Sequence, residues 1–358
     1  MELDKIISSA NDLIKKTIEF YGNQIPSIVI SPFGKNGMIF KHILNVQYGI
    51  CEKYIVDNLL AKYNPQIITT DELEKREEDL CVFLTTTKLE INKELEEKLK
   101  GDKRNIFNIM RPTIVNVHGK KEYFRYLYEL LKPFVVKNKK MIRIGRNNDG
   151  GYIMLDDFAD DMKAYSFGIC DDISWDMDVH SVGNMNVYMF DHTINRLPMY
   201  IEGCSWKKMG IGITDQKDLL SLKTILEKNG DLHNRNLILK MDIEGAEWEI
   251  LNDLGSDIIC NFKQMVFELH NLTDISTQNL IMEVLKKINK THQVSWIHGN
   301  NFGIAEFDSG YLMPESMEVL WVRKDTYEIL DVPHSLPFEM DMPNDPMKVD
   351  FDLTINEY

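Results

Sequence analysis

The segment Asn236-Leu-Ile-Leu-Lys-Met-Asp-Ile-Glu-Gly-Ala-Glu-Trp-Glu-Ile-Leu251 joins two different periodicities. Its first part is apolar except for Lys240, which is typical of a buried parallel strand. After Gly245 the apolar residues return at helical spacing. Asp242 and Glu244 lie at the transition, and open α/β sheets bind ligands beyond the carboxyl ends of their strands. The segment therefore predicts the rim of an active site.

The chain has 358 residues, which is enough for two domains with cores of their own. The apolar content falls around residues 101–104. We expect an N-terminal helix and a small Rossmann-like α/β domain over residues 1–110, followed by a larger α/β domain over residues 111–358.

The charge balance is acidic, with 41 Lys and Arg against 56 Asp and Glu and a formal net charge of −15. Binding to nucleic acid or to an anionic membrane surface needs a dense basic face, so both are disfavoured. No segment approaches the ~20 apolar residues of a membrane span, and the first residues lack the pattern of a secretory signal. The five cysteines are widely spaced without a CxxC pair. We expect a cytoplasmic protein, and an oligomer is compatible with the sequence.

The first domain shows the alternation of a small parallel α/β fold, with a β-rich run and a glycine-containing turn over residues 27–37 and further strands expected over residues 52–57 and 80–85. Gly34 and Gly37 follow the first strand, and Asp57 ends the second. The glycines and the acid have the order of a nucleotide site, but a dinucleotide fingerprint needs a third glycine. Specific nucleotide binding, NAD-dependent chemistry and a purely structural domain therefore stay open. The arrangement resembles the small Rossmann-like domains fused to bacterial sugar-modifying enzymes.

The second domain begins with a helix over residues 123–135 and a hairpin over residues 141–155. A mostly parallel sheet follows, and its two final strands are expected to form an antiparallel pair. The expected strands are residues 164–169, 187–191, 209–213, 237–241, 264–268, 293–297 and 317–322.

Polar residues recur at the carboxyl ends of these strands. Asp242 and Glu268 follow neighbouring strands, and His270 comes two residues later. Asp191 follows Gly168 by about the spacing that separates a close-approach turn from a ribose-binding acid. A single glycine in place of a triple-glycine phosphate loop favours a nucleoside without a pyrophosphate. S-adenosylmethionine fits that description.

Four motifs stand out in the second domain: Arg143-Ile-Gly-Arg-Asn-Asn-Asp-Gly-Gly-Tyr152, Lys240-Met-Asp-Ile-Glu-Gly-Ala-Glu-Trp-Glu249, Phe267-Glu-Leu-His270 and His298-Gly-Asn-Asn301. Together they resemble the FkbM-type S-adenosylmethionine-dependent O-methyltransferases over residues 136–325.

The resemblance implies a seven-stranded class I methyltransferase fold, and methyl transfer to a hydroxyl of a sugar or natural product. By motif position it implies that Gly168 approaches the methionine part of the cofactor and Asp191 the ribose. The cofactor-binding set that we expect is Gly151, Tyr152, Gly168, Asp171, Asp191 and Asp242. The family usually has two or three glycines in the first loop, where this chain has one.

An alcohol is a weak nucleophile at neutral pH, so its proton must be removed or its pKa lowered. His270 is the side chain best suited to act as base, and we assign it a catalytic role together with Asp242. Asp242 and Glu268 are also predicted to hold a Mg²⁺-like cation, because such cations prefer oxygen ligands. The alternative for His270 is a structural hydrogen bond within the sheet.

The acceptor we expect is a small-molecule carbohydrate, with a nucleotide-linked sugar for a surface polysaccharide as the specific candidate. His298, Asn300 and Asn301 lie between the last strands, where polar side chains suit a hydroxyl-rich ligand, and Trp206 is a further candidate contact. Two alternatives stay open. One is a non-sugar natural product as acceptor, and the other is a module that binds the cofactor or a nucleotide-sugar without catalysis.

Overall fold

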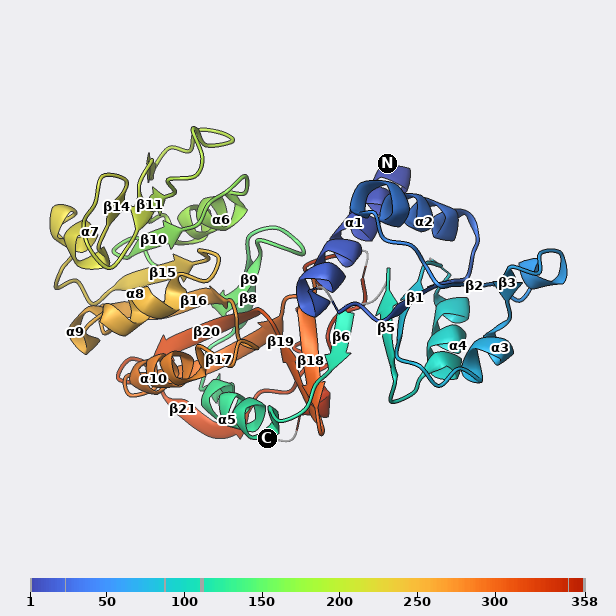
Figure 1. Cartoon of the computed structure of the whole chain (residues 1–358). Coiled ribbons are helices and arrows are strands. Elements are labelled where there is room, and N and C mark those ends of the chain that lie inside the picture. Colours follow the sequence, from blue (N-terminus) through green and yellow to red (C-terminus); the bar gives the residue numbers. More distant parts are fainter. Residues whose placement is uncertain (1, 23, 87, 110–112, 347, 357–358) are drawn as a thin grey trace. The chain divides into compact units, whose positions relative to one another are not determined.

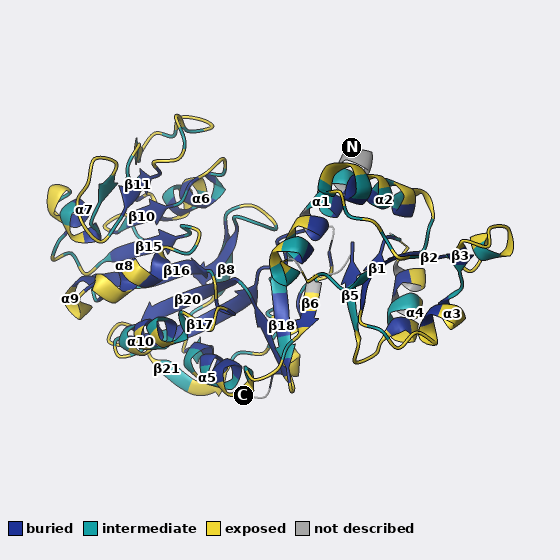
Figure 2. Ribbon diagram, in the orientation of Figure 1, coloured by how far each residue is buried: buried dark blue, intermediate teal, exposed yellow. Residues whose placement is uncertain are grey.

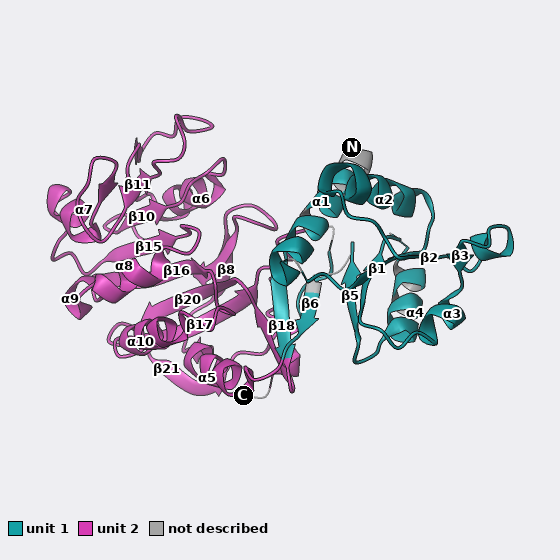
Figure 3. Cartoon of the chain, in the orientation of Figure 1, with its two compact units in different colours: residues 1–117, 301–307, 346–351 teal, residues 118–300, 308–345, 352–358 magenta. Residues whose placement is uncertain are grey.

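The computed structural model describes residues 2–22, 24–86, 88–109, 113–346 and 348–356. It divides into two compact units, shown in Figure 3. Unit 1 contains residues 1–117, 301–307 and 346–351, and unit 2 contains residues 118–300, 308–345 and 352–358. The boundary expected between residues 110 and 111 lies outside the described residues.

Unit 1 contains a five-stranded, fully parallel sheet in the order β3-β2-β1-β4-β5. This confirms the expected small parallel α/β domain. A sixth strand, β6, pairs in parallel with β18. The elements of unit 1 are α1 (Glu2–Tyr21), β1 (Ser27–Ser31), α2 (Lys35–Tyr48), β2 (Tyr54–Val56), β3 (Ile67–Ile68), α3 (Thr70–Glu74), β4 (Leu80–Leu84), α4 (Leu89–Leu99), β5 (Arg104–Asn108), β6 (Thr113–Asn116) and β18 (Ile304–Asp308).

The sheet of unit 1 is covered on both faces, as its apolar strands predict. All five residues of β4 are buried, because β4 has a strand on each side and apolar side chains on each face. Phe83 and Ile30 pack with residues of α1 and α2, whereas Val82 and Val29 pack toward α3 and α4. Figure 2 shows this buried layer.

Unit 2 is built on a seven-stranded sheet in the order β12-β11-β10-β15-β16-β20-β17. The first five strands of this order, from β12 at the edge to β16, run parallel to one another. β20 runs antiparallel to its two neighbours, β16 and β17. The expected mostly parallel sheet with an antiparallel pair at its end is therefore confirmed. The seven strands are β10 (Lys163–Phe167), β11 (Asn186–Phe190), β12 (Cys204–Lys207), β15 (Leu237–Met241), β16 (Phe262–Leu269), β17 (His292–Gly299) and β20 (Met317–Arg323).

Helices and short sheets surround this central sheet, as Figure 1 shows. The expected hairpin is present as β8 and β9. The remaining elements of unit 2 are α5 (Lys121–Leu131), β7 (Phe134–Val136), β8 (Met141–Ile144), β9 (Tyr152–Leu155), α6 (Ser174–Gly183), β13 (Gly210–Ile211), β14 (Leu219–Leu220), α7 (Leu222–Lys228), α8 (Glu247–Asp253), α9 (Ser256–Ile259), α10 (Gln278–Ile288), β19 (Tyr311–Pro314) and β21 (Ile329–Pro333).

The edge strand of the main sheet was predicted incorrectly. We expected residues 209–213, but the edge strand is β12, which pairs with β11. Only Gly210 and Ile211 of the expected segment form a strand, and they pair with β14 in a separate sheet. An edge strand has one neighbour, and the residues of β12 alternate between half-buried and exposed. It therefore lacks the apolar run by which buried strands are recognised.

Alternation along the strands decides which side chains face the β8–β9 hairpin. Val266 of β16 and Leu320 of β20 belong to the core cluster that includes the hairpin and α6. Trp321 points to the other face, where its indole N–H donates to Asn289 after α10. Glu268 is two residues after Val266 in the same strand, so its side chain lies on the same face of the sheet, toward the hairpin.

Within the described residues, no helix is both long enough and apolar enough to cross a membrane.

Candidate active site

The carboxyl end of β15 is fixed by a close approach to the end of β10. All five residues of β15 are buried, and the backbone N–H of Asp242 donates to the carbonyl of Phe167 at 3.1 Å. Gly168 has a φ of +78°, and a Cβ there would lie 1.5 Å from the carbonyl oxygen of Asp242. Only glycine fits that contact.

The chain then turns sharply into α8. Glu244 and Gly245 both have positive φ, at 58° and 101°. This turn leaves the side chain of Asp242 at the sheet edge. Glu247 lies in the first turn of α8, and its side chain points back toward the loop before the helix. There its Oε1 accepts the N–H of Ile243 at 2.9 Å.

Asp242, Glu268 and His270 meet at this edge of the sheet. One ligand atom from each residue lies within 4.8 Å of the others. His270 Nε2 lies 3.5 Å from Glu268 Oε1 and 4.0 Å from Asp242 Oδ1. The structure therefore brings together the two carboxylates and the imidazole that the sequence placed at adjacent strand ends.

Neighbouring polar groups hold the two carboxylates. The hydroxyl of Tyr152 donates to Asp242 Oδ2 at 3.3 Å, and the amide of Asn300 donates to Glu268 Oε1 at 2.6 Å. Tyr152 comes from β9 and Asn300 follows β17, so the hairpin and the far end of the sheet both contribute to the site. Two residues expected in different roles, one for the cofactor and one for the acceptor, thus contact the same acidic centre.

Electrostatic coupling at this centre is strong. Burial, followed by repulsion from Asp242 and Glu318, raises the pKa of Glu268 well above its usual value. Burial also raises the pKa of Asp242. For His270 burial disfavours the charged form, but the hydrogen bond to Glu247 and the nearby carboxylates outweigh it and raise its pKa to about 9.

Glu247 is a site residue that the sequence did not reveal. It is fully buried, and its Oε1 lies 3.1 Å from His270 Nδ1. The helix dipole by itself favours acids in the first turn of a helix. The sequence alone therefore gives Glu247 and Glu249 the same interpretation, as acids that stabilise the start of a helix. The structure separates them, because Glu249 is exposed.

Glu318 is a second residue that the sequence did not reveal. It lies directly opposite Glu268 in the antiparallel pairing of β16 and β20, and it also faces His298 of β17. Its Oε2 lies 3.1 Å from His298 Nδ1, and its Oε1 accepts from the amide of Asn344 at 2.7 Å. The sequence signal for Glu318 was a single acid within the otherwise apolar run of residues 317–322.

The expected ribose-binding acid is engaged by the protein itself. Asp191 is buried, and its Oδ2 accepts the N–H groups of Ile169 and Cys170, both at 2.9 Å. Its Oδ1 accepts the N–H of Thr193 at 2.7 Å and the hydroxyl of Thr193 at 2.6 Å. Asp191 therefore ties the loop after β10 to the end of β11. A contact with ribose stays a prediction.

The remaining expected residues are dispersed. Asp171 is exposed in the loop after β10, and Gly151 closes the turn between β8 and β9, where a Cβ would lie 1.9 Å from the carbonyl oxygen of Arg146. Asn301 belongs to unit 1, where its amide donates to the carbonyl of Val349 at 3.4 Å. Trp206 lies on β12, which β11 and β10 separate from β15.

In unit 1, Asp57 serves as a backbone anchor. Its carboxylate accepts the N–H groups of Phe33, Leu59 and Leu60 at 3.1, 3.0 and 2.9 Å. These contacts close the loops after β1 and β2. They support a structural role for Asp57, and nucleotide binding by unit 1 stays a prediction.

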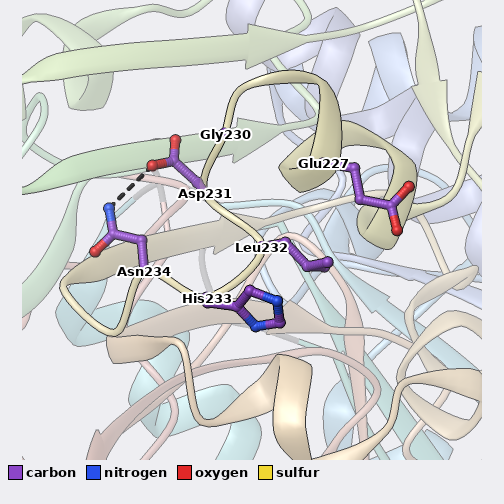
Figure 4. Close-up of a pocket in the computed structure, with 6 residues that line it drawn as sticks. All are labelled: Glu227, Gly230, Asp231, Leu232, His233 and Asn234. Carbon is purple, nitrogen blue, oxygen red and sulfur yellow. Dashed lines mark hydrogen bonds between the residues drawn. The ribbon is translucent and has the colours of Figure 1, made fainter.

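A pocket of about 600 Å³ lies before the amino end of β15, at the edge of the sheet opposite Asp242 (Figure 4). Its buried acid, Asp231, accepts from Asn234 at 3.0 Å, as drawn, and from Lys163 at 2.8 Å and Tyr165 at 2.7 Å. Lys163 balances the charge of Asp231, and the three donors together hold its carboxylate in place.

Comparison with protein families finds a similarity over part of unit 2. The model of the methyltransferase FkbM domain matches residues 162–291, so this segment is similar to that domain. The matched segment begins just before β10, ends just before β17 and contains Asp242, Glu247, Glu268 and His270. The β8–β9 hairpin and Glu318 lie outside the match.

Among solved structures, precorrin-6y C5,15-methyltransferase from Geobacter metallireducens is similar to 46% of this chain and 80% of its own. The sequence identity is 11% and the TM-score is 0.26, values too low for that protein to inform the fold or reaction of this one. No curated protein matches the sequence.

Proposed function

We propose that the chain transfers a methyl group from S-adenosylmethionine to a hydroxyl of a carbohydrate, with a nucleotide-linked sugar as the candidate acceptor. The observation that carries the proposal is the convergence of Asp242, Glu268 and His270 at the carboxyl edge of the parallel sheet. It combines a group that can accept a proton with carboxylates that can accept hydrogen bonds from hydroxyls. The methyltransferase FkbM domain supports the class of reaction.

The loop after β10 fits the methyl donor. Gly168 and Asp191 shape this loop, and it ends on the exposed Asp171 at the carboxyl end of β10, where α/β sheets bind nucleosides. Gly151, Tyr152 and Asp242 would complete the donor site. The donor supplies an electrophilic methyl group on a sulfonium sulfur.

The chain's own part in the reaction is to orient the acceptor and take its proton. A positioned base contributes about 10²–10⁴-fold. His270 must be neutral to act as base, yet its pKa of about 9 keeps it charged at neutral pH. A divalent cation on Asp242 and Glu268 would favour the neutral imidazole by charge repulsion, and it would lower the pKa of an acceptor hydroxyl. We therefore propose Mg²⁺ or a similar cation at these two carboxylates.

Isotope transfer tests the proposal. Purified protein is incubated with methyl-labelled S-adenosylmethionine and a panel of nucleotide-sugars, with added Mg²⁺ or with a chelator. Transfer to a sugar hydroxyl that stops when the chelator is added supports both the methyltransferase activity and the cation at Asp242 and Glu268. Full activity with the chelator would contradict the cation, and binding of the methyl donor without transfer to any acceptor would contradict the enzyme and favour a binding module.

Substitution of one histidine tests the base. His270→Ala should lower kcat by about 10²–10⁴-fold and leave the affinity for S-adenosylmethionine nearly unchanged. His233→Ala is the matched control, because His233 is an exposed histidine before the amino end of β15. A wild-type rate in His270→Ala would defeat the assignment.

A further inference from the structure

Glu247 occupies an unusual position for a carboxylate at the start of a helix. It is fully buried, whereas Glu249, two residues later in the same turn, is exposed. Its Oε1 has two partners, the N–H of Ile243 at 2.9 Å and His270 Nδ1 at 3.1 Å. Its Oε2 is buried and has no hydrogen-bond partner among the residues that the structure describes. A buried carboxyl group with an unsatisfied oxygen is costly, so its presence calls for a functional explanation.

The contact with His270 fixes the position of a proton. Glu247 Oε1 accepts the N–H of Ile243, so it faces Nδ1 as an acceptor, and the Nδ1 that contacts it must carry hydrogen. In the neutral ring the other nitrogen, Nε2, is then without a proton. Nε2 is the atom that lies 3.5 Å from Glu268 Oε1 and 4.0 Å from Asp242 Oδ1, on the side of the acidic centre.

A second contact with α8 holds the backbone of His270. The carbonyl of His270 accepts the indole N–H of Trp248 at 2.7 Å, so the backbone of His270 is tied to α8. Trp248 directly follows Glu247. The first turn of α8 therefore holds both the backbone and Nδ1 of His270, and Nε2 is directed away from the helix.

We propose that Glu247 is a positioning residue, which holds neutral His270 in the Nδ1–H tautomer and so leaves Nε2 as the atom that accepts the proton of the acceptor hydroxyl. This inference rests on the proposed function. It adds to that function an orienting residue, the reactive nitrogen and the tautomer.

The step is balanced in atoms and charge. The proton passes from the acceptor hydroxyl to Nε2, and an oxygen lone pair forms the new bond to the methyl carbon. The electron pair of the broken carbon–sulfur bond stays on sulfur, which becomes a neutral thioether. The imidazolium that results is stabilised through Nδ1–H by the carboxylate of Glu247, as an orienting acid stabilises a catalytic histidine.

A purely structural role would use Glu247 differently. To close the turn before α8 it needs only to accept the N–H of Ile243. In that role it would accept nothing from Nδ1, and the tautomer of His270 would be left unconstrained. The two roles differ in the tautomer of one side chain, which can be measured without any acceptor.

The tautomer is read from NMR spectra of the full chain labelled with ¹⁵N-histidine, recorded as the pH is raised until the two ring-nitrogen signals of His270 stop changing. The signals of His270 are assigned by their loss in His270→Gln. We expect a protonated Nδ1 and an unprotonated Nε2. An Nε2–H tautomer in the wild-type protein would overturn the proposal, whatever the acceptor panel shows.

Two variants of Glu247 connect the tautomer to the rate. Glu247→Gln keeps an oxygen that accepts from Nδ1–H, so it should keep the tautomer, whereas Glu247→Leu should release it. We expect kcat to fall by about 10²–10⁴-fold in Glu247→Leu with KM nearly unchanged, and to recover in large part in Glu247→Gln.

Glu249→Leu and Glu249→Gln are the controls, because they make the same changes at an exposed position of the same turn. Their rates should equal the wild-type rate. Equal losses in both Glu247 variants, with the Nδ1–H tautomer kept in both, would overturn the link between tautomer and rate. If no acceptor in the panel is methylated, the proposed function fails while the tautomer measurement still decides the position of the proton.

Discussion

Replacing Gly168 by alanine should force apart the ends of β10 and β15. The new methyl group would lie 1.5 Å from the carbonyl oxygen of Asp242, whereas ordinary contact needs at least 3.4 Å. The two segments must therefore move by about 2 Å, and overpacking of this kind costs about 1–3 kcal/mol. The positive φ adds about 1–2 kcal/mol. We expect a loss of about 2–5 kcal/mol in the free energy of unfolding.

Gly230→Ala is the matched control for this substitution. Gly230 has a similar φ of +73°, but a Cβ there would meet no atom within 4 Å. It should therefore lose only the conformational part, about 1–2 kcal/mol. Urea unfolding followed by circular dichroism measures both variants, and calorimetry measures their affinity for S-adenosylmethionine. Equal unfolding midpoints for the two variants would refute the close approach as the reason for glycine at position 168.

Two further predictions concern the charges of the site. The pKa of His270 rises from 6.5 to about 9 on folding, so its contribution of about 3 kcal/mol is complete below pH 6.5 and is lost as the pH rises through 9. The difference in unfolding free energy between wild type and His270→Ala should shrink accordingly in urea titrations, and a difference independent of pH would contradict this. Glu268→Gln should increase the free energy of unfolding at about pH 8 by roughly 1 kcal/mol, because burial and repulsion from Asp242 and Glu318 raise the pKa of Glu268, so that its ionisation favours the unfolded chain. A lower midpoint would show that the charge stabilises the fold.

The sequence predicted those parts of the fold in which the apolar pattern and the local turn chemistry agree. The residues of β15 form an apolar run ending in acid and glycine, and the structure has a buried strand, a tight turn and a helix there. β12 was not predicted, because an edge strand with one covered face lacks a continuous apolar run. Its Cys204-Ser-Trp-Lys207 is less strand-like than the Gly-Ile-Gly-Ile that follows.

The sequence likewise predicted some residues of the acidic centre and missed others. Asp242, Glu268 and His270 were predictable because they follow parallel strands, whose carboxyl ends must meet at one edge. Glu318 enters from the start of the antiparallel strand β20, so its place depends on strand direction and register, which sequence patterns leave undefined. Glu247 has the sequence environment of an ordinary acid at a helix start. Its function is evident only from its burial and from the ring nitrogen that it contacts.

The division of the chain into units has an evolutionary consequence. Each unit is assembled from three separate stretches, so the chain passes from one unit to the other five times. An event that joins two genes end to end cannot supply either unit whole. A shortened chain that begins after residue 117 would keep β18 without its parallel partner β6. A single break of the chain at any of these five crossings therefore divides at least one of the two units.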